Sequence, residues 1–258
     1  MDDHANALAA WSLQDTIGVL NAGALAGKLD VARPHAGLHH AAFDYEREAC
    51  LLFCTRRSSE SSEADVAWPL SVADSYIRGN DLVATYRPTK DWPYSPQLYW
   101  QAKTLAAVDG ALASLSHLVS VQTHLLDTCP KITVASQVPS SEVLYIALGE
   151  GGQAEVEPAD QATTITPTGS TCCVLRRLLA APFSYVEIVS AADVRNIAFS
   201  VGAKGRIVAE WHVFADFLEK GVIRRARIHG ALLPRENDVE LAVECCRAIE
   251  DSPLPLTT

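Results

Sequence analysis

Apolar and polar residues alternate along much of this chain, and this period of two is typical of half-buried β-strands. The alternation is clearest over residues 114–126, where every second residue from Leu115 to Leu125 lies on one face and more polar residues lie on the other. Further apolar runs predict strands over residues 13–20, 28–31, 49–55, 131–138, 142–148 and 221–233. The pattern therefore predicts a mainly β protein.

Turn and helix signals complete this picture. Gly79, Asn80 and Asp81 tolerate positive φ and predict a hairpin between residues 78 and 87. Near the C-terminus, apolar residues recur at i, i+4 and i+8, after Asn237 or Asp238 as a cap and before Pro253 as a stop. This segment predicts a C-terminal α-helix packed by one face on a sheet.

The chain contains a faint internal similarity. Arg56-Arg57 precedes Ser71-Val-Ala-Asp74 at nearly the same interval at which Arg176-Arg177 precedes Ser190-Ala-Ala-Asp193. Such spacing indicates one β-rich unit used twice.

Two related halves would form an antiparallel β-sandwich or an extended double sheet. The first half would cover residues 11–105, and the second half, with the C-terminal helix, residues 112–258. One continuous domain is the alternative, because length alone permits either.

Composition restricts the class of protein. Hydrophobic residues make up 48% and charged residues 20% of the chain, which is ordinary for a globular protein. The formal net charge of -10 disfavours binding to nucleic acid or to an anionic membrane surface. The N-terminal residues lack the pattern of a secretory signal, so we expect a cytoplasmic protein with reduced cysteines.

Candidate metal ligands and nucleophiles have simpler structural explanations. His35, His39 and His40 lie beside a glycine, which favours an exposed loop over a metal site. Cys50 and Cys54 would be about 13 Å apart on a strand, too far to share a zinc ion. We expect these thiols, and the pairs Cys172-Cys173 and Cys245-Cys246, to be small buried apolar groups. With no nucleophile or phosphate-binding motif either, we predict no catalytic residue, no metal and no cofactor.

The best candidate for a binding surface is the segment 86–100, which is rich in aromatic residues and proline. Proline stiffens the backbone, so flat aromatic faces could stack on a ligand at little entropic cost. The predicted binding residues are Arg78, Arg87, Trp92, Tyr94, Tyr99 and Trp100. The competing interpretation is that these rings cover a sheet edge or fill the interior. Full burial of Trp92 and Trp100 would exclude the aromatic platform.

Two classes of function fit these observations. The leading hypothesis is a non-catalytic binding or interaction protein whose partner is a small molecule, such as a sugar, or another protein. A homodimer could form through an exposed sheet edge. The alternative is a carbohydrate-binding protein or carbohydrate-active enzyme on a large β-sandwich, with Asp74 and Asp193 as proton-transfer groups. The simpler interpretation is that each aspartate stabilises a turn between two strands.

Two stretches of the chain resemble a family of uncharacterised bacterial proteins. They are Pro69-Leu-Ser-Val-Ala-Asp-Ser-Tyr-Ile-Arg-Gly-Asn-Asp81 and Leu218-Glu-Lys-Gly-Val-Ile-Arg-Arg-Ala-Arg227. The resemblance implies no activity and no site residue.

Overall fold

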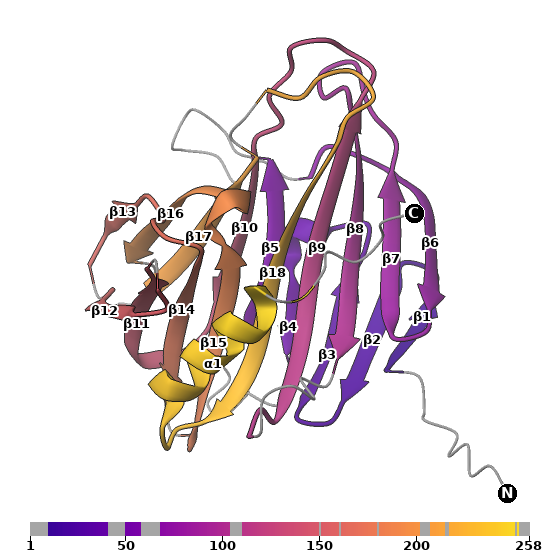
Figure 1. The fold of residues 1–258 in the computed structure, drawn as a ribbon. Coiled ribbons are helices and arrows are strands. Elements are labelled where there is room, and N and C mark those ends of the chain that lie inside the picture. The colour runs from indigo at the N-terminus through magenta and orange to yellow at the C-terminus, as the bar shows by residue number, and fades with distance from the viewer. Residues whose placement is uncertain are drawn as a thin grey trace, which may run out of the picture.

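The chain forms two antiparallel β-sheets and one C-terminal helix in a computed structural model (Figure 1). The structure describes residues 10–40, 50–57, 68–103, 110–149, 151–159, 161–179, 181–201, 207–214, 217–250 and 252. Over these residues each sheet has nine strands, which confirms the predicted mainly β double sheet with a C-terminal helix. None of the helices in the described part of the chain has the length and hydropathy of a membrane-spanning segment.

Sheet A begins with five strands from the N-terminal part of the chain. Four strands from later in the chain complete it at the other edge. Its order is β1 (Trp11–Gln14), β2 (Ile17–Ala22), β3 (Leu25–Asp30), β4 (Leu38–His40), β5 (Leu51–Arg57), β10 (Ile132–Gln137), β17 (Ile207–Val213), β16 (Val194–Val201) and β13 (Thr163–Ile165). A short 3-10 helix, η1 (Pro34–Ala36), connects β3 to β4. The single strand predicted over residues 13–20 is instead a hairpin, because the chain turns at Asp15, where φ is 53°.

Sheet B carries the surface on which the candidate site lies. Its order is β12 (Ala154–Pro158), β11 (Ser140–Leu148), β14 (Thr171–Leu178), β15 (Phe183–Ser190), β18 (Ile223–Pro234), β9 (Ala113–Thr123), β8 (Tyr94–Lys103), β7 (Asp81–Tyr86) and β6 (Val72–Arg78). A second 3-10 helix, η2 (Ala191–Asp193), follows β15. The predicted hairpin at residues 78–87 is confirmed, with Arg78 paired to Asp81 across a turn in which Gly79 has a φ of 59°.

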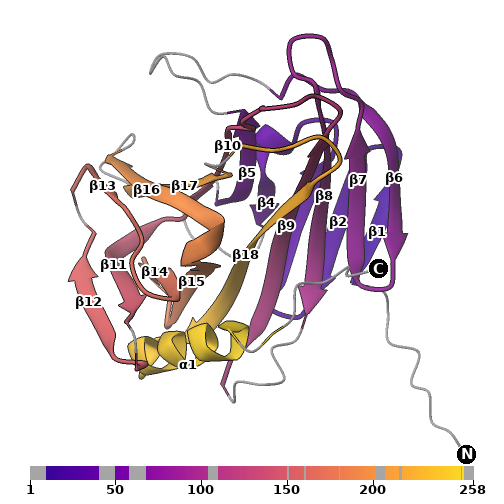
Figure 2. The ribbon, with the colours of Figure 1, turned by 45° about the horizontal axis from the view of Figure 1, so that its top comes forward.

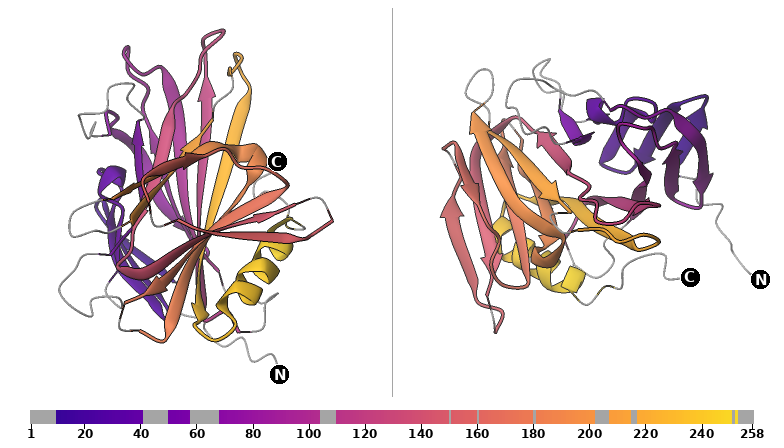
Figure 3. Two further views of the ribbon diagram at one scale, coloured as in Figure 1. Left: turned by 90° about the vertical axis from the view of Figure 1, so that its left-hand side faces the viewer. Right: turned by 90° about the horizontal axis from the view of Figure 1, so that it is seen from above.

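Both sheets continue across the predicted boundary between the halves. β5 pairs with β10 in sheet A, and β8 pairs with β9 in sheet B. Strands from early in the chain lie at one end of the molecule and strands from late in the chain at the other (Figure 3). One hydrophobic cluster between the sheets includes residues from both ends. The internal duplication itself stays a prediction.

Helix α1 (Asp238–Glu250) packs on the outer face of sheet B, away from sheet A (Figure 2). Its apolar face covers residues of β14 and β15, among them Cys173, Leu175 and Ile188. Cys245 and Cys246 of the helix and Cys173 of β14 are buried between the helix and sheet B, whereas Cys172 is buried on the other face of β14, in the core between the sheets. Their burial confirms that these thiols act as buried apolar groups. The helix leaves β6–β9 uncovered by its own apolar face.

Candidate functional site

The outer face of β6–β9 and β18 carries an unusual number of polar side chains, and we call it the polar face. On β8, Leu98 and Trp100 belong to the core between the sheets, so the alternate residues Gln97, Tyr99 and Gln101 point the other way. The same alternation applies to the neighbouring strands, because each has its own core-facing residues. On these strands of sheet B, the alternation of side chains places one face against sheet A and the other face outward.

Antiparallel register arranges the polar face into three rows that cross the strands in the order β6, β7, β8, β9 and β18. The first row is Arg78, Asp81, Gln101, Ser116 and His229. The second row is Tyr76, Val83, Tyr99, Leu118 and Arg227. The third row is Asp74, Thr85, Gln97, Ser120 and Arg225.

The first row is partly connected by hydrogen bonds. Gln101 Nε2 donates to Asp81 Oδ2 at 3.0 Å, and the same carboxylate oxygen lies 3.6 Å from the Arg78 guanidinium. At the other end of the row, Ser116 Oγ and His229 Nδ1 are hydrogen-bonded at 2.5 Å. The carboxylate of Asp81 and the imidazole of His229 therefore lie on one line, separated by Gln101 and Ser116.

Two buried polar atoms on this face have no hydrogen-bond partner within the described part of the chain. They are Gln101 Oε1 and Arg225 Nε. Gln101 is only 3% exposed, and leaving a buried acceptor unpaired costs about 1–3 kcal/mol. Gln101 Oε1 is therefore an acceptor whose partner is not among the described residues.

Tyr99 lies in the middle of the polar face. Its hydroxyl donates to Gln97 Oε1 at 2.5 Å, which joins the second row to the third. Burial raises the pKa of Tyr99, with a further increase from nearby Tyr76 that Arg78 and Arg225 oppose. The phenol therefore stays protonated at neutral pH and acts as a hydrogen-bond donor.

The predicted aromatic platform is not formed. Trp92 is 3% exposed and Trp100 0%, so neither ring can stack on a ligand from solvent. Trp92 makes edge contacts with Trp68 and Tyr94 at ring-centroid distances of 5.1 and 5.5 Å. Trp100 stacks on His117 at 5.1 Å, inside the sandwich. The rings fill the interior, because burying their large apolar area stabilises the fold more than exposing it would.

Three other predicted residues have separate positions. Arg78 lies at the end of the first row of the polar face, and its side chain is 51% exposed. Arg87 is exposed and directly follows β7, where its backbone N–H donates to the Ser71 carbonyl. Tyr94, 6% exposed, belongs to the aromatic cluster around Trp92. The structure therefore brings Arg78 and Tyr99 together on one face and separates them from Trp92, Tyr94 and Trp100.

Asp74 and Asp193, the aspartates of the enzyme hypothesis, do not form a pair. Asp74 is exposed on the edge strand β6. Asp193 lies in η2, where its carboxylate accepts a hydrogen bond from the backbone N–H of Arg227 on β18. Three strands separate β6 from β18, so about 19 Å lies between them. Burial raises the pKa of Asp193, and its hydrogen bond connects the turn after β15 to β18.

His117 is a buried histidine inside the sandwich, not a proton-transfer group open to solvent. Its Nδ1 lies 3.1 Å from the Tyr99 carbonyl and its Nε2 2.8 Å from Thr55 Oγ1. A carbonyl only accepts, so Nδ1 carries the proton and Nε2 accepts from the threonine hydroxyl. Burial lowers the pKa of His117 to about 3, which keeps the ring neutral.

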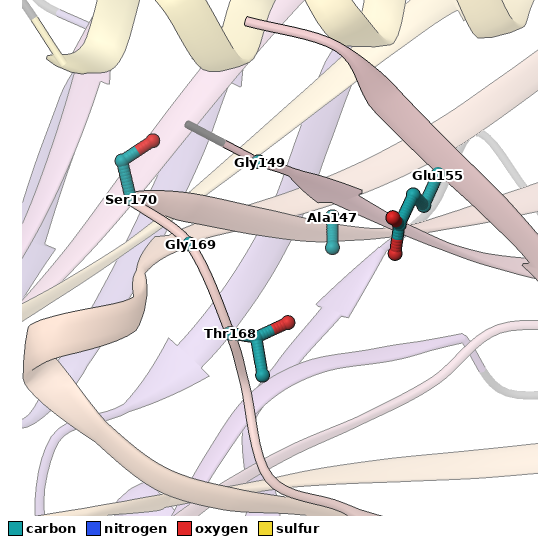
Figure 4. A pocket seen from close by; sticks show the side chains of 6 residues that line it. All are labelled: Ala147, Gly149, Glu155, Thr168, Gly169 and Ser170. Atoms are coloured by element: carbon teal, nitrogen blue, oxygen red, sulfur yellow. The ribbon is translucent and has the colours of Figure 1, made fainter. Parts of the chain in front are cut away.

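A small surface hollow of about 430 Å³ lies beside the end of β11 (Figure 4). Thr168 and Glu155 border it, together with the backbone around Gly149 and Gly169. Ser170 at its rim is already hydrogen-bonded to the Glu250 carboxylate on α1. With one carboxylate and one available hydroxyl, the hollow offers far fewer binding groups than the polar face does. Elsewhere, no three His, Cys, Asp or Glu side chains gather as a metal site among the residues with described positions.

Several members of the polar face were not singled out by sequence reasoning, among them Gln101, Ser116, Arg225 and His229. A signal was present in the pattern Gln97-Leu-Tyr99-Trp-Gln101 and in the serines that alternate with apolar residues along 114–120. Both patterns show a second, polar face on strands whose other face is apolar. Which of these polar residues become neighbours depends on the order and register of the strands. Those are set by contacts between segments that are far apart in the sequence.

Comparison with known proteins gives a fold and no family. No family model matches the chain, and no curated protein matches its sequence. Among solved structures, the protein HI1317 is similar, with a TM-score of 0.50 and 8% sequence identity over 86% of this chain and 94% of that one. At this identity the similarity concerns the fold alone.

Two further solved structures are similar at lower TM-scores. One is a candidate aldose 1-epimerase from Klebsiella pneumoniae, with a TM-score of 0.46 and 8% identity over 94% of this chain and 87% of that one. The other is the α-galactosidase AgaA from Geobacillus stearothermophilus, in complex with 1-deoxygalactonojirimycin, with a TM-score of 0.43 and 10% identity. It matches 84% of this chain, which spans 40% of the α-galactosidase.

Proposed function

We propose that this protein binds a carbohydrate on the polar face of sheet B. The observation that carries the proposal is the amide oxygen of Gln101, which is buried without a hydrogen-bond partner within the described chain. A sugar hydroxyl can donate to this oxygen and, through its own oxygen, accept from a neighbouring group. A polyol such as a sugar can therefore supply the hydrogen-bond donor that Gln101 Oε1 lacks among the described residues.

The surrounding groups suit a polyol. Asp81 is an acceptor, and Arg225 Nε is a donor without a partner among the described residues. Ser116 and His229 form a hydrogen-bonded pair on the far side of Gln101. Tyr76 is 37% exposed at the edge of the second row, where its ring can contact the apolar face of a sugar. Specific sites commonly combine a few placed polar groups with an apolar contact in this way.

The arrangement supports binding rather than glycoside hydrolysis. Hydrolysis uses two carboxyl groups about 5–9.5 Å apart, one on each side of the scissile bond. The two carboxylates on the polar face are those of Asp74 and Asp81. Asp81 lies opposite Arg78 in the β6–β7 register, and Arg78 is four residues from Asp74 along β6. Four residues of strand span about 13 Å, which is therefore the approximate separation of the two aspartates. The two carboxylates are too far apart for that chemistry.

The proposal can be tested by thermal unfolding of the purified protein with a panel of mono- and disaccharides. A ligand at one hundred times its dissociation constant stabilises a protein by about 2.7 kcal/mol, which raises the melting temperature measurably. Gln101→Leu removes the unpaired acceptor, and we expect it to abolish the shift. Gln14→Leu, an exposed glutamine on β1, is the matched control and should keep it.

Two results would contradict the proposal. One is the absence of any shift with every sugar in the panel, confirmed by titration calorimetry at millimolar sugar. The other is an equal shift in Gln101→Leu and in the unmodified protein, which would place the sugar elsewhere on the molecule.

A further inference from the structure

Strand β6 is the last strand of sheet B, and among the described residues no strand pairs with its other side (Figure 1). Its backbone groups alternate in direction. Arg78 pairs with Asp81 across a two-residue turn, so the N–H and C=O groups of Arg78, and of alternate residues before it, point towards β7. The corresponding groups of Ser75 and Ile77 therefore point away from the sheet, where a further strand can bind.

The side chains on the outer face of β6 carry opposite charges at the two ends of the strand. Ile77 packs against the core, so the alternate residues Asp74, Tyr76 and Arg78 lie on the outer face. All three of these side chains are exposed to solvent. The strand thus presents an acid, an aromatic ring and a base in line beside its unpaired edge.

We propose that two copies of this protein form a dimer by antiparallel pairing of their β6 strands, with a two-fold axis at Tyr76. In this register Ser75 of one copy faces Ile77 of the other, so the outward backbone groups of both copies meet in hydrogen-bonded pairs. Asp74 faces Arg78 of the second copy, and the axis repeats this ion pair on its other side. About four backbone hydrogen bonds then join the two sheets edge to edge.

The two neighbouring registers lack this match of charges. Residues that face one another must both have outward backbone groups, so a long overlap otherwise places the axis at Ser75 or at Ile77. With the axis at Ser75, Asp74 faces Tyr76 of the second copy. With the axis at Ile77, Arg78 faces Tyr76 instead. The register centred on Tyr76 is therefore the one that the charges favour.

The other edges of the two sheets are less suited to pairing with a second copy. At the opposite edge of sheet B, β12 carries Glu155 and Glu157, which would repel one another in a self-paired strand, and Pro158, which has no N–H to donate. Sheet A ends in β1, with four residues, and in β13, with three. Strand β6 has seven residues and no proline, so it offers the longest edge for pairing.

The dimer adds a residue of the second copy to the polar face. Arg78 lies 3.6 Å from Asp81 in its own chain and meets Asp74 of the second copy across the edge. The first row therefore ends in one guanidinium between two carboxylates, and the two polar faces are continuous across the axis. This arrangement does not depend on carbohydrate binding, so its test needs no sugar.

Sedimentation velocity over a wide range of protein concentration measures the dimer. We expect a species of twice the chain mass that dissociates on dilution. Ser75→Pro removes an outward N–H but no bond to β7, and it should raise the dissociation constant at least about tenfold. Val156→Pro makes the same change on β12, where alternate residues bond to β11 and Val156 points away, and it should have no effect. A protein that stays monomeric at every concentration, or a dimer weakened equally by both prolines, would overturn the proposal.

Charge substitutions test the register. Asp74→Arg and Arg78→Asp each place like charges opposite one another, so each variant alone should dissociate at least about tenfold more readily. An equal mixture of the two variants should form a heterodimer, because every charge then faces its opposite. Thermal unfolding of each variant checks that it is folded. Two folded variants that do not associate when mixed would contradict this register.

A disulfide across the axis measures the register independently of charge. A residue that faces itself in a non-hydrogen-bonded antiparallel pair has a Cα–Cα separation of about 4.5 Å, which a disulfide can span. Tyr76→Cys should therefore form a cross-linked dimer when oxidised glutathione accepts the two thiol hydrogens and is itself reduced. Asp74→Cys, about 13 Å from its counterpart, should not, and the unmodified protein controls for the native cysteines. Cross-linking through position 74 but not through position 76 would show that the strands pair differently or not at all.

Discussion

Arg176 on β14 and Glu187 on β15 form an ion pair in which both side chains are completely buried. Arg176 NH1 lies 3.2 Å from Glu187 Oε2, and the same oxygen accepts a hydrogen bond from Trp211 Nε1 at 3.0 Å. Arg176 NH2 donates to the Ser136 carbonyl in sheet A at 3.3 Å, so the pair connects the two sheets. These contacts offset the large cost of removing two charges from water.

Removing one member of this pair should be far worse than removing both charges. Arg176→Met leaves Glu187 charged and unpaired, and we expect a loss of about 3–5 kcal/mol in the free energy of unfolding. Glu187→Gln keeps an acceptor for Trp211 but leaves the arginine unpaired. Urea denaturation of both single variants and the double variant checks this, and losses that simply add would contradict the coupling.

A close contact at Gly230 gives a second prediction. A Cβ at this position would lie 2.4 Å from the Tyr185 hydroxyl and 3.0 Å from Phe53 Cζ. Gly230→Ala should therefore destabilise the protein by about 1–3 kcal/mol through overpacking. Tyr185→Phe in the same chain should recover part of the loss, and Gly149→Ala, with its nearest atom at 3.6 Å, is the neutral control. A Gly230→Ala protein as stable as the parent would contradict the geometry.

Buried His117 should make stability depend on pH below neutrality. Burial holds its pKa at about 3, below its ordinary value of 6.5, so between these values the unfolded chain binds a proton that the folded chain does not. The free energy of unfolding should then fall by about 1.4 kcal/mol per pH unit as the pH decreases from 6.5 towards 3, and show no contribution from this group above pH 6.5.

The comparison with His117→Gln isolates this contribution. The two proteins share all other titrating groups, so the difference between their free energies of unfolding should be constant above pH 7. Between pH 6 and 4 the unmodified protein should lose stability relative to the variant. Chemical denaturation at several pH values measures it. Parallel curves over that interval would show that His117 gains a proton in the folded protein.

Trp92 should affect stability through packing rather than ligand contact. Trp92→Ala removes a ring held by edge contacts with Trp68 and Tyr94, and we expect a loss of about 3–5 kcal/mol. Trp92→Phe keeps an aromatic ring and should lose less. Thermal and chemical denaturation give these values; an unchanged stability of Trp92→Ala would restore the exposed platform as an explanation for this segment.

Local sequence patterns predicted much of the secondary structure. Alternation over 114–126 and the Gly79-Asn80 turn predicted β9 and the β6–β7 hairpin, and the i, i+4, i+8 spacing of Leu241, Cys245 and Ile249 predicted α1. These signals are local: they depend on strand and helix periodicity and on backbone preferences at a turn. For the same reason a mainly β fold with a C-terminal helix could be predicted without any long-range contact.

Local patterns could not predict which polar residues meet or which aromatic residues are buried, because both depend on how the strands pair and the sheets pack. Asp81, Gln101, Ser116 and His229 come from four strands up to 148 positions apart, and register alone puts them in one row. Tyr99 and Trp100 are neighbours in sequence, yet one faces outward and the other inward, because side chains alternate across a strand. Whether an aromatic segment binds a ligand or fills a core depends on the sheet that packs against it.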